Sequence, residues 1–132
     1  MSAQDVASEL DAYVRRTALL PWAWGVQDCT IWPADWCLLR WGFDPAARFR
    51  GRYSTEAGAL ALTAGGLLAT VAPEIALPRK AAAAEGDLGI LDIMGREVAA
   101  IRGGDRWLFR TPRGVGMARR TALAIWGDEC RR

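Results

Sequence analysis

The first seventeen residues show the hydrophobic repeat of an amphipathic helix. Apolar side chains recur at intervals of three and four residues, at Val6, Leu10, Tyr13 and Val14. The positions between them are largely charged, which suits a helix with one face in water. Ser2 has a side chain suited to cap the N-terminus. We therefore predict a helix over residues 2–17 that packs on the rest of the protein through its apolar face.

The stretch from Pro21 to Gly42 holds five of the seven tryptophans and two of the three cysteines. Its apolar positions form a broad stripe at helical spacing, so we predict a central helix from about Cys29 to Trp41 that is covered on more than one side. Asp28 precedes this helix. Its carboxylate is placed to accept hydrogen bonds from the first free backbone N–H groups, as an N-cap does.

Trp22 and Trp24 lie in the loop that leads into this helix, between the chain-breaking residues Pro21 and Gly25. Two interpretations are open. Either both tryptophans anchor the core, or one of them lines a groove at the mouth of the central helix.

Beyond the central helix, the pattern predicts more helix and then strands. A helix opens at Ser54-Thr55-Glu56 and runs to about Ala64, Gly65-Gly66 stops or kinks it, and a helical segment continues over 67–71. After residue 86 the period changes to that of short strands joined by turns. The predicted strands are 87–93, 97–102, 106–110, 115–118 and 121–126.

This order of elements indicates the fold class. Helices come first and strands follow without βαβ alternation, which is typical of an α+β protein with N-terminal helices packed on a small antiparallel β-sheet. The length of 132 residues and the 52% hydrophobic content fit one domain over residues 1–132. Within it, residues 1–73 form the predicted helical half and residues 86–126 the predicted sheet half.

Charge gives little support for a nucleic-acid partner. The chain has 17 basic and 15 acidic residues, a net charge of +2. A short run places Arg48, Arg50 and Arg52 around Phe49 and Tyr53, a mixture that can bind single-stranded nucleic acid. The run is short and the net charge small, so we expect no nucleic-acid partner. No export signal and no membrane-spanning segment is expected either.

The sequence contains no histidine, which excludes an imidazole base, acid or metal ligand from this chain. We expect no metal and no cofactor. Cys29 and Cys37 are about 12 Å apart by helical rise, too far for a disulfide. Together with Cys130 they give three cysteines, not the even number of a disulfide framework, which favours synthesis in a reducing, intracellular compartment.

Cys29 is the one candidate nucleophile, because the first turn of a helix favours a thiolate through backbone donors and the helix dipole. The same position also suits a cysteine that merely packs.

The order of motifs resembles the NlpC-type cell-wall endopeptidases, a papain-like family. That family has Asp-Cys at a helix start, then a Gly-Asp strand, then a strand that begins with the catalytic histidine. Here Asp28-Cys29 and Gly86-Asp87 match the first two motifs. The chain is most similar to a branch encoded in tail-assembly clusters of phages and gene-transfer particles. The segments that carry this resemblance are PWAWGVQDC, Asp35-Trp36, GFDPA…RGRYST, Gly65-Gly66-Leu67 and Ile125-Trp126.

The resemblance fails at the histidine. Alignment from Gly86-Asp87 places Glu97 at the family's histidine position, with Arg96 beside it. Glutamate disfavours a nearby thiolate by charge repulsion, and arginine cannot shuttle protons at neutral pH. The resemblance therefore implies a site composed of Asp28, Glu97 and Cys29, in which Cys29 is the relic of a nucleophile.

Three functions are then open. The resemblance favours a tail-tip or baseplate component of a virion tail, made in the cytoplasm of a bacterial host, with a baseplate hub or distal tail protein as partner. The alternative is a divergent cysteine peptidase or amidase that cleaves peptidoglycan with Cys29, using Glu97 or a partner's residue in place of histidine. A small assembly chaperone that is absent from the finished particle is the third.

Overall fold

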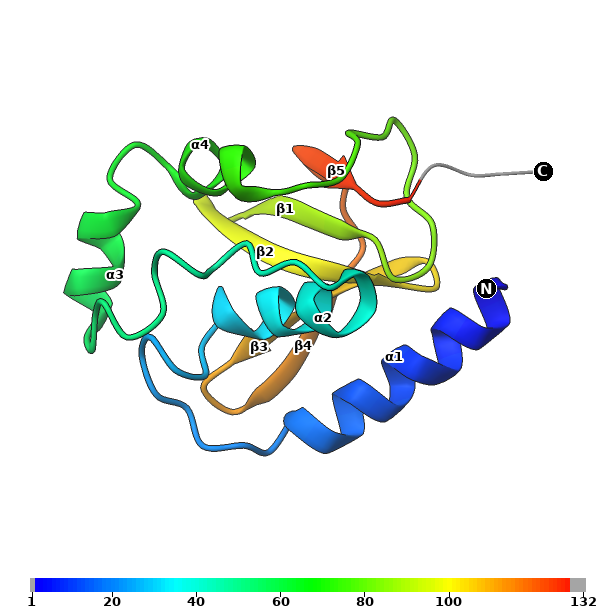
Figure 1. Cartoon of the computed structure of the whole chain (residues 1–132), viewed down its shortest axis with the longest axis horizontal. Helices are drawn as coiled ribbons and strands as arrows, with labels where there is room; N and C mark the ends of the chain where they lie inside the picture. Colours follow the sequence, from blue (N-terminus) through cyan, green and yellow to red (C-terminus); the bar gives the residue numbers. More distant parts are fainter. Residues whose placement is uncertain (1, 129–132) are drawn as a thin grey trace.

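The protein contains a five-stranded antiparallel sheet, and helices cover one face of this sheet (Figure 1). The computed structural model describes residues 2–128. The helices are α1 (Ala3–Thr17), α2 (Ile31–Trp41), α3 (Glu56–Leu62), α4 (Leu67–Val71) and the 3-10 turn η1 (Ala72–Glu74). The strands are β1 (Leu88–Ile93), β2 (Arg96–Gly103), β3 (Arg106–Thr111), β4 (Gly114–Ala118) and β5 (Ala124–Trp126). This confirms the predicted α+β class and its order of helices and strands.

The sheet has the strand order β4-β3-β2-β1-β5. Strands β1 to β4 follow one another as the predicted antiparallel meander, and β5 returns to pair with β1 on its free side. Leu88 marks the centre of this arrangement, because it lies opposite Ile101 of β2 and Trp126 of β5. The last strand, Ala124–Trp126, is shorter than the predicted 121–126; Ala122, before it, packs against the cluster of Leu91, Ala100 and Trp107.

Helix α1 forms where the hydrophobic repeat predicts it. The Ser2 hydroxyl accepts a hydrogen bond from the Asp5 N–H at 3.2 Å, and the Asp5 carboxylate accepts one from the Ser2 N–H at 3.3 Å, which is a complete capping box. Val6, Leu10 and Tyr13 are buried in one cluster with the two tryptophans Trp32 and Trp36 of α2. The amphipathic face of α1 therefore joins the core through α2.

Helix α2 is the centre of the core, and Trp32, Trp36 and Cys37 are completely buried in it. The helix begins at Ile31, two residues later than predicted. The reason is local: the Asp28 carboxylate accepts hydrogen bonds from the N–H groups of both Thr30 and Ile31, which holds the residues between as a turn. The prediction that Asp28 caps a helix beginning at Cys29 is therefore corrected: the N-cap residue of α2 is Thr30, and Cys29 lies in the turn before the helix. The Asp28 carboxylate does accept backbone N–H groups at the helix start, as predicted.

Gly86-Asp87 joins the helical half to the sheet. The Trp36 indole N–H donates a hydrogen bond to the Gly86 carbonyl at 2.8 Å. Gly86 has φ +84°, and a Cβ atom there would lie 2.6 Å from the Cγ1 of Val6. Asp87 is also buried, and its carboxylate accepts hydrogen bonds from Lys80 Nζ at 2.7 Å and from the Ala84 N–H at 2.8 Å. In this chain the Gly-Asp motif thus has a structural role.

Candidate functional site

Cys29 and Glu97, which are far apart in the sequence, line the same pocket of about 90 Å³. The pocket lies between the start of α2, the loop before α3, the helices α3 and α4, and the start of β2. Its walls are mixed: Trp24, Phe49 and Leu67 contribute apolar surface, and polar groups come from the residues described below. The fold therefore brings the start of the α2 turn and the start of β2 to one cavity.

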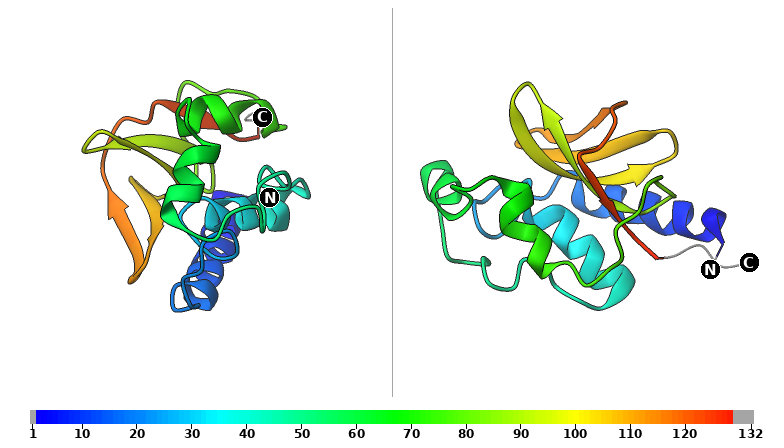
Figure 2. Two further views of the ribbon diagram at one scale, coloured as in Figure 1. Left: turned by 90° about the vertical axis from the view of Figure 1, so that its left-hand side faces the viewer. Right: turned by 90° about the horizontal axis from the view of Figure 1, so that it is seen from above.

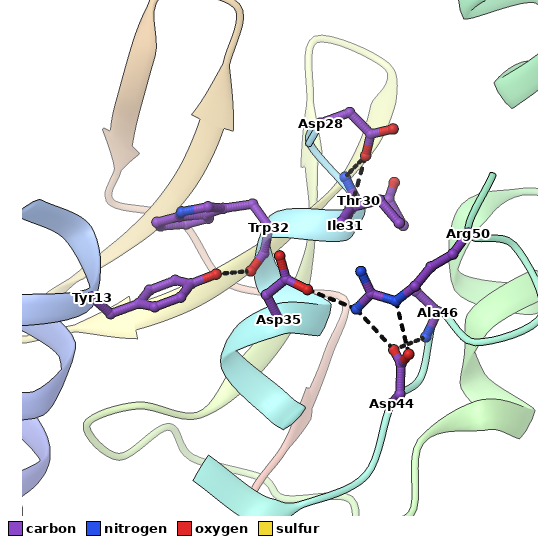
Figure 3. Close-up of polar contacts among 9 residues, drawn as sticks. All are labelled: Tyr13, Asp28, Thr30, Ile31, Trp32, Asp35, Asp44, Ala46 and Arg50. Carbon is purple, nitrogen blue, oxygen red and sulfur yellow. Dashed lines mark hydrogen bonds and ion pairs between the residues drawn. The ribbon is translucent and has the colours of Figure 1, made fainter. Parts of the chain in front are cut away.

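Asp28 lies behind this pocket and is completely buried. Besides the two N–H groups of the α2 turn, its carboxylate accepts a hydrogen bond from the Gly25 N–H at 2.8 Å and another from the Tyr53 hydroxyl at 2.5 Å. Four donors therefore converge on one carboxylate. Figure 3 shows its contacts with Thr30 and Ile31 at the helix start.

Cys29 is partly buried, and its surroundings disfavour the thiolate. Burial raises the pKa of the Cys29 thiol, and the neighbouring Asp28 carboxylate raises it further. A hydrogen bond with Thr30 and the positive charge of Arg96 act in the opposite direction, but the pKa stays above its ordinary value. The thiolate fraction at neutral pH is therefore below the few per cent of a free cysteine.

Glu97 is an exposed residue whose carboxylate has a structural partner. Its Oε1 atom accepts a hydrogen bond from the N–H of Leu68, in the first turn of α4, at 2.9 Å. Beside it, Arg96 forms a 3.2 Å ion pair with Glu56 of α3. Two successive residues of β2 thus hold the two short helices that wall the pocket.

The sequence pattern does not indicate that Tyr53 and Gly25 belong to this site. In the sequence, Tyr53 belongs to an arginine–aromatic run, yet its hydroxyl donates a hydrogen bond to Asp28. Burial raises the pKa of Tyr53, and the contact with Asp28 raises it further. Gly25 was assigned to a loop break, yet its N–H is another donor to Asp28. The two contacts join residues that are 25 and 3 positions apart.

Arg50, at the centre of the arginine–aromatic run, has a structural role. Arg50 lies between two carboxylates, with an N–O distance of 2.7 Å to Asp35 of α2 and 2.8 Å to Asp44 of the following loop (Figure 3). Burial raises the pKa of Asp35, whereas for Asp44 the hydrogen bonds from Arg50 and the Ala46 N–H outweigh burial and lower the pKa. Arg50 therefore fastens the loop that carries Tyr53 onto α2.

Of the two interpretations of the loop tryptophans, the structure supports the one in which one tryptophan lines a groove; both residues are only partly buried, so they do not both anchor the core. Trp24 lines the pocket beside Cys29. Trp22 packs edge-on against Trp24, with ring centroids 5.1 Å apart, and the guanidinium of Arg110 lies 5.8 Å from its ring centroid. Trp22 thus anchors the loop on β3, and Trp24 lines the groove.

Other site types have little support in residues 2–128. No group of three His, Cys, Asp or Glu side chains there is arranged to hold a metal ion. Cys29 and Cys37 are both free thiols, burial raises the pKa of Cys37 to about 12, and Cys130 lies outside the described residues. No single helix in this range is long and apolar enough to cross a membrane; only α3 together with Leu67–Glu74, bent by 66° between them, meets that test.

The fold and the pocket define an α+β domain in which an Asp-Cys turn, with the aspartate buried and the cysteine at a pocket, precedes the central helix beside a five-stranded antiparallel sheet. The family model described as Domain of unknown function (DUF6950) matches residues 1–127, and the chain belongs to that family. No curated protein and no solved structure matches the sequence.

Proposed function

We propose that the chain is a structural component of the tail tip or baseplate of a phage or phage-like particle. In this proposal, a domain with the papain-like NlpC-type fold has lost catalysis and acts through contacts with other tail proteins, such as a baseplate hub or a distal tail protein. The proposal combines the resemblance described above with the state of the pocket. One observation carries it: Glu97, which the resemblance aligns with the family's histidine, accepts a hydrogen bond from the Leu68 N–H.

The chemistry of amide cleavage explains why this observation matters. A cysteine peptidase needs a base to form the thiolate and an acid to protonate the leaving nitrogen, and a positioned acid–base group contributes roughly a hundred- to ten-thousandfold. The sequence has no histidine for this task. Burial and Asp28 keep the Cys29 pKa high, so the thiol is a poor nucleophile as well. The chain thus offers no imidazole for either proton transfer.

One observation favours a second function, a divergent peptidoglycan-cleaving cysteine peptidase or amidase. Cys29 lines an open pocket instead of being sealed in the core, and Arg96 and Glu97 line the same pocket. A partner that supplied an imidazole at this pocket would restore the missing group. This alternative requires Cys29 for biological activity, whereas the structural proposal does not.

The two functions make opposite predictions for Cys29→Ala. Under the structural proposal, particles made with this variant contain the chain and keep wild-type infectivity, because a methyl group replaces the thiol at a packing position. The measurement is plaque or transfer efficiency together with mass spectrometry of purified particles. Cys29→Ser, which keeps the size and polarity of the side chain, is the control and should behave alike.

Two results would contradict the structural proposal. Cys29→Ala particles that assemble with normal composition but lose infectivity would support the enzyme. A wild-type chain that is missing from purified particles would instead support the assembly chaperone.

A further inference from the structure

Strand β4 is an open edge of the sheet. It pairs with β3 on one side only, whereas the opposite edge strand β5 is partly covered through the bridge between Arg79 and Trp126 and the hydrogen bond from the Lys80 N–H to the Ile125 carbonyl. Figure 2 shows the β3–β4 hairpin, in orange, at an outer margin of the sheet. Edge strands are usually protected by charged residues, proline or a bulge. The five residues of β4, GVGMA, include neither charge nor proline.

A largely apolar groove, whose lining also includes Asp11, Glu85 and Arg106, lies beside this strand. It lies between α1 and the sheet and has a volume of about 460 Å³. Val14 of α1 and Leu108, Val115 and Met117 of the β3–β4 hairpin contribute its apolar walls, and Met117 is 55% exposed. A strand added beside β4 would place alternate side chains toward this groove, because successive side chains of a strand point to opposite faces.

The two ends of β4 are basic. Arg113 precedes the strand, and Arg119 and Arg120 follow it; all three are exposed. Arg119 forms a 3.1 Å ion pair with Asp105, which is also 3.7 Å from Arg106, so one carboxylate serves two arginines. Arg113 has no ion pair with any residue in 2–128. On the α1 side of the groove, Asp11 is paired with Arg15 at 3.0 Å.

We infer that β4 accepts an extended segment of a partner protein as a sixth strand, and that this segment carries apolar residues at alternate positions and acidic residues at its two ends. Main-chain hydrogen bonds to the free edge would provide affinity, and the groove and the flanking arginines would provide specificity. This inference rests on the proposed function in one respect: both assume that the chain acts by binding other proteins.

A second copy of this chain fits the edge poorly. Antiparallel pairing of two β4 strands about Gly116 would place Arg113 of each copy opposite Arg119 of the other. Like charges directly opposite each other destabilise a strand pair. An acidic partner segment gives opposite charges at the same two positions.

Synthetic peptides test this inference on the intact chain. The probe is a seven-residue peptide in which five residues of alternating valine and threonine have glutamate at both ends, so that the two glutamates can face Arg113 and Arg119. The charge control has lysine at both ends, and the backbone control carries N-methyl groups on alternate amides. NMR should show that the glutamate peptide slows hydrogen exchange of the alternate β4 amides that do not pair with β3. It should bind about fivefold or more tightly than the lysine peptide, and the N-methylated peptide should not bind.

Charge reversal gives the matched variant. Arg113→Glu combined with Arg119→Glu should reverse the preference toward the lysine peptide, whereas Arg52→Glu, in the loop between α2 and α3, should leave it unchanged. Equal binding of the two peptides, unchanged exchange of the β4 amides, or dimerisation of the free chain through β4 would overturn the inference.

Particle composition separates this inference from the proposed function. Peptide binding at β4 by a chain that is absent from particles would refute the tail role and leave the edge-strand inference standing. Wild-type incorporation of the charge-reversed variant into particles would refute the edge-strand inference and leave the tail role standing.

Discussion

Asp28→Ala is expected to lower the free energy of unfolding by about 3–5 kcal/mol, a large part of the stability of a domain this size. The carboxylate is completely buried and accepts four hydrogen bonds, three from backbone N–H groups and one from Tyr53. Removing it leaves all four donors without their acceptor, and each buried donor without a partner costs about 1–3 kcal/mol before the structure relaxes. Chemical denaturation of the purified variant measures this loss.

Tyr53→Phe is the control for this prediction, because it removes only one of the four donors and keeps the aromatic ring. It should cost about 1–2 kcal/mol. A loss below 1 kcal/mol for Asp28→Ala, or equal losses for both variants, would contradict the interpretation that Asp28 is the acceptor that organises the start of α2.

Gly86→Ala should destabilise the protein by about 2–4 kcal/mol. The residue has φ +84°, and an added Cβ would lie 2.6 Å from the side chain of Val6 and 3.3 Å from that of Trp36. The backbone conformation costs an alanine about 1–2 kcal/mol, and overpacking a core usually adds about 1–3 kcal/mol. Thermal or chemical unfolding measures the loss.

Gly95→Ala separates these two contributions. Gly95 has nearly the same φ, +85°, but no atom lies within 4 Å of a Cβ placed there. This variant should therefore cost only the backbone component, about 1–2 kcal/mol. If Gly86→Ala is no more destabilising than Gly95→Ala, the contact of Gly86 with α1 and α2 does not hold the two halves of the domain together.

Local patterns in the sequence were sufficient to predict most of the elements. The repeat of Val6, Leu10 and Tyr13 predicts α1 almost to the residue, because a surface helix must place its apolar side chains on one face. Gly65-Gly66 separates α3 from α4 as expected. The turn signals after residue 86 locate β1 to β4 within a residue or so, since short strands must end where glycine allows the chain to reverse.

Long-range contacts were beyond those patterns. Nothing near Tyr53 in the sequence indicates that its hydroxyl reaches Asp28, and nothing near Arg50 indicates the pair of carboxylates around it. The sequence also does not indicate which strands form the edges of the sheet. Strand β4 is an edge because β5 pairs with β1 and not with β4. Such contacts depend on the packing of elements that are distant in the chain.

The candidate site combines both kinds of information. The motif Asp28-Cys29 indicated a helix-start cysteine, and alignment from Gly86-Asp87 indicated Glu97 as its counterpart. Both line one pocket. The pocket's chemistry depends on features that emerge only on folding: the burial of the thiol, the four donors on Asp28, and the use of Glu97 to hold α4. Those features are the basis for proposing a non-catalytic role.

The rate of Cys29 alkylation by iodoacetamide as a function of pH tests that role most directly. The reaction should be measured on the folded protein by mass spectrometry of the Cys29 peptide, with Cys29→Ser showing the labelling of other cysteines. Burial and Asp28 raise the thiol pKa, so we predict alkylation slower than that of free cysteine at pH 7, increasing only above the free-thiol pKa of about 8.5. Alkylation faster than free cysteine at pH 7, with an apparent pKa well below that value, would contradict a vestigial site and indicate an activated nucleophile.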